Sequence, residues 1–120
     1  MNDSIGPSIL KRIEAAGRKV LPMHKFLAES DPATLDVFDQ FLMHSIYRED
    51  GLQEGHKEMV LACICVAAGS SQPVIANHCR KALAAGLKKD HLVQALEITA
   101  AVMATRTLAA GINAVIDAGD

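Results

Sequence analysis

The 120-residue sequence predicts an all-α fold, a bundle of about six helices in a single domain over residues 1–120. Apolar residues recur at spacings of three and four, which is the period of an amphipathic helix. Prolines and glycines lie where helices begin and end, and no alternating strand or hairpin pattern is present. Half of the residues are hydrophobic but only 3% are aromatic, so the core has to be built from small and aliphatic side chains.

The first two helices are predicted from their proline signals. Pro7 suits the first position of a helix, where its missing N–H is not needed, and Pro22 interrupts that helix. Its apolar stripe is Ile9, Leu10, Ile13 and Val20. The segment 30–32, Ser-Asp-Pro, is a start signal for a second helix that ends near residues 48–51. Its stripe is Leu35, Phe38, Leu42 and Ile46.

The third helix is predicted to start at residues 54–57 and to be the central buried helix. Residues 59–68 are apolar on every side, which is typical of a helix inside a core. A strand over residues 60–66 is the competing interpretation, but the segment is rich in alanine and its neighbours are helical. Residues 69–71 stop this helix and cap the next one.

The C-terminal half predicts three more helices. Ser71 is a good N-cap for the fourth helix, Pro73 follows in its first turn, and Gly86 ends it. Asp90 is predicted to cap the fifth, which Gly111 weakens or ends before a last short helix through Ala118. The stripe of the fifth helix is Leu92, Leu96, Thr99 and Met103.

The bulk composition excludes several classes of protein. A net charge of −2 with scattered basic residues gives no case for nucleic-acid binding. The longest apolar run, residues 59–69, is about half the length needed to span a bilayer, and residues 1–7 lack a signal-peptide pattern. We therefore expect no membrane segment and a cytoplasmic location. The mean hydropathy of +0.18 suggests surface hidden between subunits of a homo-oligomer.

The cysteines and histidines form no metal or disulfide pattern. Cys63, Cys65 and Cys79 are an odd number without framework spacing, and we expect them to be reduced, buried, apolar residues. The five histidines lack the spacing of paired metal ligands, so no metal is expected. Ser71 and His78 are about 10 Å apart along one helix, too far for a nucleophile–base pair.

His78 and Glu58 are the two candidate catalytic residues. His78 shares a helix face with Val74 and Ala82, so it is either a satisfied polar core residue or a general acid/base. Glu58 opens the apolar third helix, where it is either a charge favoured at a helix start or a partly desolvated proton carrier.

Residues 71–91 carry a family resemblance. The segment Ser71-Gln-Pro-Val74, then His78 and a run of small residues to Gly86, resembles the signature of the carboxymuconolactone decarboxylase / alkylhydroperoxidase (AhpD-like) family. That family usually has Cys-x-x-Cys-x-x-x-His here, so Ser71 and Val74 stand at its cysteine positions. Counting from Glu58 instead puts those positions at residues 70 and 73, which are not cysteines either. The resemblance covers roughly residues 50–105, including residues 90–96, where His91 and Gln94 replace common acids.

The resemblance implies an AhpD-like helical bundle, assembled as a trimer or hexamer, in which Glu58 and His78 form a proton relay. The first hypothesis is a decarboxylase or lyase without a cofactor, with Ser71, Val74 and Cys79 as candidate residues of the substrate pocket. The alternative is a non-catalytic ligand-binding or assembly module on the same fold. Thiol peroxidase activity is disfavoured because it needs a dithiol pair.

Overall fold

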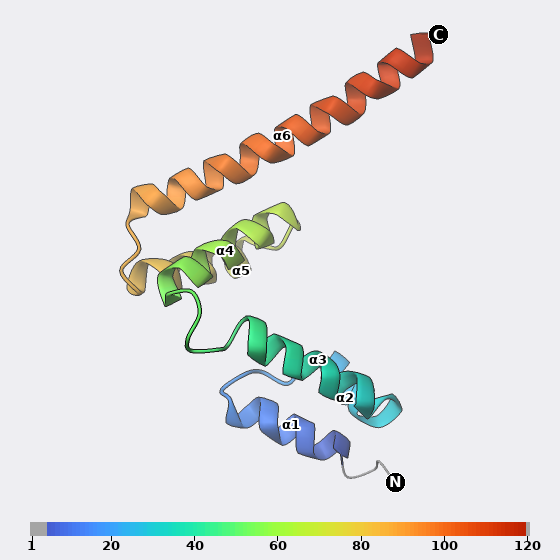
Figure 1. Ribbon diagram of the computed structural model, residues 1–120, viewed down its shortest axis with the longest axis vertical. Coiled ribbons are helices and arrows are strands. Elements are labelled where there is room, and N and C mark those ends of the chain that lie inside the picture. Colours follow the sequence, from blue (N-terminus) through green and yellow to red (C-terminus); the bar gives the residue numbers. More distant parts are fainter. Residues whose placement is uncertain (1–4, 120) are drawn as a thin grey trace. The chain divides into compact units, whose positions relative to one another are not determined.

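The computed structural model describes residues 5–119, and these residues form six helices and no strand (Figure 1). The helices are α1 (Ile5–Ala15), α2 (Pro22–Ser30), α3 (Pro32–Ser45), α4 (Glu54–Ala67), α5 (Gln72–Ala84) and α6 (Lys89–Gly119). The prediction of an all-α fold with about six helices is confirmed. Residues 1–4, on which the expectation of no signal peptide partly rests, lie outside the described residues.

The chain divides into two compact units, residues 1–50 and residues 51–120. The first unit contains α1, α2 and α3, and the second contains α4, α5 and α6. This division does not test the prediction of one domain over residues 1–120, which stays a prediction.

Helix α2 was not predicted from the sequence, because a proline can mark either the end of one helix or the beginning of another. Pro22 was predicted to interrupt the first helix, but that helix already ends at Ala15 and Pro22 starts a new one. The Leu21 N–H donates to Nδ1 of His24 at 2.9 Å, which pairs one of the amide groups that a helix start leaves free. His24 is buried by this arrangement.

The core of the first unit is small and aliphatic. Ile9 and Ile13 of α1 pack with Ala28 of α2 and Leu35 of α3, and all four are buried. Gly6 is part of this packing, because a Cβ at that position would overlap the carbonyl oxygen of Ala28. Asp31 caps α3 as the start signal predicted, accepting from the Thr34 N–H at 3.1 Å.

A buried carboxylate joins α3 to α1 and to the segment after it. Asp39 is only 1% exposed and accepts hydrogen bonds from Arg12 at 3.1 Å and from Arg18 at 2.5 Å. Arg12 also donates to Asp36 at 2.8 Å. This hydrogen bond raises the pKa of the Arg12 guanidinium and lowers the pKa of the Asp36 carboxyl. The guanidinium of Arg18 also lies over the Tyr47 ring, 5.0 Å from its centroid.

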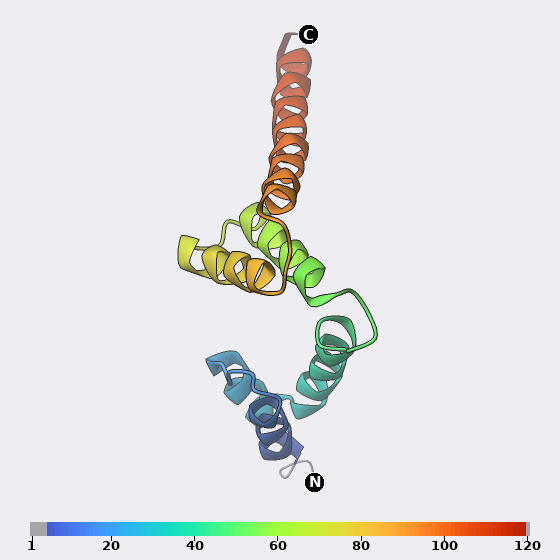
Figure 2. The same ribbon diagram turned by 90° about the vertical axis from the view of Figure 1, so that its left-hand side faces the viewer.

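Helices α4 and α5 are packed side by side in the second unit, as Figures 1 and 2 both show. Small residues allow the approach: Ala62 of α4 and Ala82 of α5 are buried, and a Cβ at Gly55 would lie 3.4 Å from the Cβ of Leu87. Helix α4 was predicted to be buried on every side, and this prediction is wrong for the single chain. Val60 is 42% exposed and Ile64 is 56% exposed, because α5 and α6 cover only part of its circumference.

Two glycines end α4 and α5 in the left-handed conformation. Gly69 has φ of 76° and Gly86 has φ of 99°, values that residues with a Cβ rarely adopt. After α5, the Gly86 N–H donates to the Leu83 carbonyl and the Leu87 N–H donates to the Ala82 carbonyl. This is the pair of bonds of a Schellman cap. The predicted stop at Gly86 is confirmed, and the turn carries the chain directly into α6.

Helix α6 is one continuous helix of 31 residues, so the predicted break at Gly111 is wrong. A glycine inside a helix costs only about 1 kcal/mol relative to alanine, which a helix of this length tolerates. Asp90 lies inside the first turn instead of capping it, and its carboxylate accepts from the His91 N–H.

By length and composition, α6 is the one helix among the described residues that could cross a membrane, and none of its most apolar stretch is buried. The expectation of no membrane segment considered only uninterrupted apolar runs, and single charges such as Glu97 and Arg106 interrupt this one. Helices of soluble proteins can be equally long and apolar, so one such helix is weak evidence for a membrane protein.

Candidate functional site

Glu58 and His78 meet where α4 packs against α5. Nδ1 of His78 lies 2.8 Å from Oε1 of Glu58, a direct hydrogen bond between residues 20 positions apart. Glu58 is in the second turn of α4 and His78 is near the middle of α5. The expectation that these side chains lie within hydrogen-bond reach is confirmed, and their catalytic role stays a prediction.

The two side chains differ in exposure. The side chain of Glu58 is 8% exposed and that of His78 is 20% exposed. An ionised carboxylate only accepts, so a bond to ionised Glu58 requires the proton on Nδ1 and leaves Nε2 as the ring nitrogen for other partners. Glu58 therefore orients the imidazole, and His78 is the better placed of the two to reach a ligand.

The other predicted pocket residues, Ser71, Val74 and Cys79, lie at the start and near the middle of α5. Ser71 is the N-cap residue of α5, but its side chain makes no capping hydrogen bond. Val74 lies one turn before His78 and is exposed. Cys79, Cys63 and Cys65 are free thiols, and all three are partly buried where full burial was expected.

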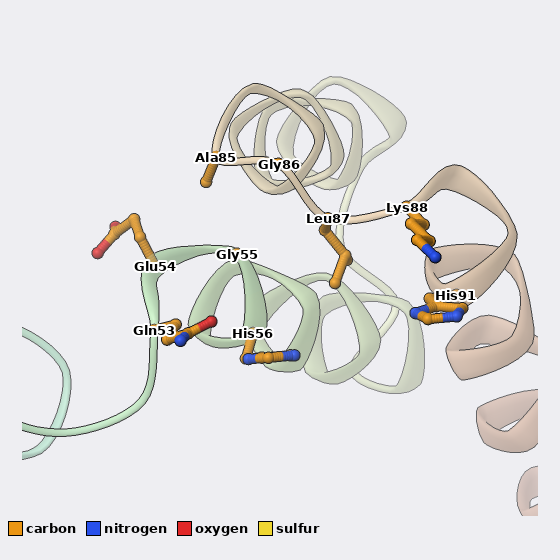
Figure 3. Close-up of a pocket in the computed structure, with 9 residues that line it drawn as sticks. All are labelled: Gln53, Glu54, Gly55, His56, Ala85, Gly86, Leu87, Lys88 and His91. Atoms are coloured by element: carbon orange, nitrogen blue, oxygen red, sulfur yellow. The ribbon is translucent and has the colours of Figure 1, made fainter.

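Two adjacent cavities lie in the second unit, at the starts of α4 and α6 and the end of α5. The larger has a volume of about 420 Å³ and the smaller about 250 Å³. Both are lined by His56, Leu87 and His91, and Figure 3 shows the two imidazole rings pointing into the same space from α4 and α6. Neither cavity is lined by Glu58 or His78. The expectation that these two residues border a cavity is therefore not met by either one.

The spacing of the histidines predicted no paired metal site, and nothing in the sequence placed His56 and His91 together. Their helices are joined through α5, so sequence spacing carried no sign that the two residues share a cavity. Within residues 5–119, no group of three or more metal-binding side chains is brought together. The two histidines thus form part of a polar cavity wall and not a complete ligand set.

A comparison with protein families shows which family the chain is related to. The model of the Carboxymuconolactone decarboxylase family matches residues 32–117. The chain belongs to this family. The match begins with α3 and runs almost to the end of α6, so it includes both Glu58 and His78 and extends beyond the resemblance at residues 50–105. Comparisons with curated proteins and with solved structures found no match.

Proposed function

We propose that this member of the carboxymuconolactone decarboxylase family is a small decarboxylase or related lyase that needs no cofactor. His78 would transfer the proton and Glu58 would position it. The observation that carries the proposal is the hydrogen bond of 2.8 Å between Nδ1 of His78 and the buried Glu58 carboxylate. This bond leaves Nε2 of a partly exposed imidazole as the group that meets the substrate.

The proposed substrate is a lactone that bears a carboxylate and a conjugated carbonyl system. The bond between the substrate carbon and its carboxylate breaks, carbon dioxide leaves, and the electron pair passes into the conjugated system. Nε2 of doubly protonated His78 then gives its proton to carbon, and the ring regains a proton from water. While the ring holds both protons, the negative charge of Glu58 offsets its positive charge.

Further parts of the proposal concern the surroundings of this pair. Ser71, Val74 and Cys79 are the proposed pocket residues, since Ser71 is the N-cap of α5, Val74 and Cys79 lie on it, and all three are within two turns of His78. We expect the protein to be cytoplasmic and to assemble as a trimer or hexamer. The absence of cysteine at residues 71 and 74 supports chemistry without thiol exchange.

The test measures carbon dioxide release from a carboxylated lactone by wild-type protein and by His78→Gln and Glu58→Gln. Loss of the proton donor should lower kcat by about 10²- to 10⁴-fold. Glu58→Gln should cost less, because glutamine still accepts the bond but does not offset the charge. His44→Gln is the control, since His44 is exposed on α3 and its Nε2 lies 3.5 Å from Arg48. Equal activity of wild type and His78→Gln would refute the role of His78.

The second candidate function is a non-catalytic ligand-binding or assembly module on the same fold. It is favoured by one observation: the cavities lined by His56 and His91 do not include Glu58 or His78. A carboxylated lactone that binds wild-type protein without turnover, and whose binding falls in His56→Ala but not in His78→Gln, would support this function instead.

A further inference from the structure

The exposed face of α6 carries a heptad repeat. Six residues follow one another at alternating spacings of four and three, and all six are exposed. They are Ile98, Val102, Thr105, Ala109, Ile112 and Ile116. This alternation is the spacing of the a and d positions of a coiled coil, sustained here over nearly three heptads. We call these six residues the α6 seam.

Apart from Ile98, which lines the smaller cavity beside α4, the α6 seam lies on the exposed part of α6. The buried residue of α6 is Leu92, in the first turn, and every described residue from 101 to 119 is exposed. Figure 2 shows the C-terminal part of α6 running clear of α4 and α5. Large apolar side chains on the seam are strongly exposed, Val102 by 63% and Ile116 by 58%. A contiguous apolar face of this kind marks an interaction site.

The order of the residues in the seam is symmetric about residue 107. When two copies of α6 run in opposite directions with residue 107 at the crossing point, each d position of one copy meets an a position of the other. The resulting layers are Ile98 with Ile116, Val102 with Ile112, and Thr105 with Ala109. The small central layer lets the two helices approach closely, and a groove of about 350 Å³ lined by Val102, Thr105 and Ala109 lies at that point.

We propose that the α6 seam is a homotypic interface that binds the same seam of a second copy in an antiparallel pair. Of the two expected assemblies, this pairing allows the hexamer and not the trimer. Pairing about residue 107 overlaps residues 95–119 of each copy, about 37 Å of helix 10–12 Å wide, so two facing copies bury roughly 800 Å² in total. That area is at the low end of the range for protein interfaces. The symmetry of the seam is what a two-fold contact requires, since the same patch is used by both copies.

A lipid bilayer is a poorer occupant for the same helix. Arg106 lies at the midpoint of the apolar stretch, where a bilayer would place its charge at the centre of the hydrocarbon. In the antiparallel pair Arg106 flanks the seam and its guanidinium stays in water. Glu97 and Asp117 also lie outside the seam positions, so the pair buries no acidic side chain.

The test compares two identical substitutions on opposite sides of α6. Thr105→Glu places a charge in the central layer, and Thr107→Glu places the same charge on the opposite, exposed face. Light scattering should show wild type and Thr107→Glu as an even multiple of 12.8 kDa, and Thr105→Glu at half that mass. A wild-type monomer or trimer, equal masses for all three proteins, or transfer of the wild type into phosphatidylcholine vesicles would overturn the proposal.

A second experiment does not depend on how Thr105→Glu folds. Protein carrying Thr105→Cys is mixed with protein carrying Ala109→Cys and oxidised, with wild type treated alike to show what the three native cysteines contribute. The antiparallel layer predicts a disulfide-linked dimer in the mixture above that background. Cross-linking of Thr105→Cys alone to the same extent would indicate parallel helices and would overturn the pairing, as would a mixture that stays at background.

Discussion

The carboxylate of Glu58 on α4 and Nδ1 of His78 on α5 are 2.8 Å apart, and the carboxylate is the more buried partner. The two residues lie on different helices, so this bond is not one between neighbouring turns of a single helix. It depends on the close contact of α4 with α5, which Ala62, Ala82 and Gly55 permit. Detecting this bond in solution would therefore test both the packing of the second unit and the proposed orientation of the imidazole.

The first prediction concerns the tautomer of His78. With Glu58 present, the neutral ring should carry its proton on Nδ1, and long-range ¹H–¹⁵N correlation spectra should show that form. Glu58→Ala should abolish the preference, whereas the exposed His44 should give the same signal in both proteins. If the neutral ring of wild-type His78 is protonated on Nε2, it cannot donate to Glu58 and the proposed positioning is wrong.

The second prediction concerns the buried carboxylate of Asp39. Asp39→Ala should destabilise residues 1–50 by about 3 kcal/mol, because it leaves the largely buried Arg18 without its partner. Asp36→Ala is the matched control: Asp36 also bonds Arg12, but its side chain is 34% exposed, so its loss should matter far less. Urea unfolding followed by the fluorescence of Tyr47, the single tyrosine, reports on this unit. Equal midpoints for the two variants would contradict the prediction.

The third prediction is a pH dependence that arises from Asp36. Its hydrogen bond with Arg12 lowers the pKa of the folded carboxyl below the ordinary 3.8. The unfolded chain then takes up its proton first as the pH falls, so the stabilisation is complete above about pH 4 and disappears as the pH drops through the folded pKa. Asp36→Asn should therefore be slightly less stable than wild type at pH 7 and equal to it near pH 2. A difference that is unchanged at pH 2 would exclude this linkage.

The Glu58–His78 pair was predictable because both residues stand at defined places in helices with clear start signals, and because the family resemblance joins them. The Asp39 contact with Arg18 was not predictable. Arg18 follows a turn at the end of α1, and no periodicity relates that segment to α3. Helix α2 was missed because Pro22 carries the same local signal for a stop and for a start. The cavity of His56 and His91 depends on three segments whose contacts no local pattern encodes.

The length of α6 shows a different limit. The break was expected at Gly111 because glycine is a poor helix former, but the flanking residues continue the helical pattern on both sides. Local propensity of about 1 kcal/mol is smaller than the summed preference of two adjoining helical segments. The same continuity produces the α6 seam, which a break at residue 111 would have divided before its last two members, Ile112 and Ile116.

The last prediction concerns the thiol chemistry that this chain lacks. Ser71 is the N-cap residue of α5 and Val74 is in its first turn, where the Val74 N–H donates to the Ser71 carbonyl at 3.1 Å. Thiols at a helix start have lowered pKa values and exchange readily. Wild-type protein should therefore not consume hydroperoxide with a dithiol donor, because a hydroxyl and a hydrocarbon occupy these positions.

Ser71→Cys combined with Val74→Cys should introduce a disulfide that a mild reductant opens, since both positions are exposed and lie three residues apart on one side of the helix start. Each single substitution is the control, because one thiol at this place has no partner within the same turn. The measurement is the number of free thiols before and after reduction, together with peroxide consumption. Peroxide turnover by the wild type that disappears in Cys79→Ser would contradict this prediction. It would show that the protein has redox chemistry and that this chemistry resides at Cys79.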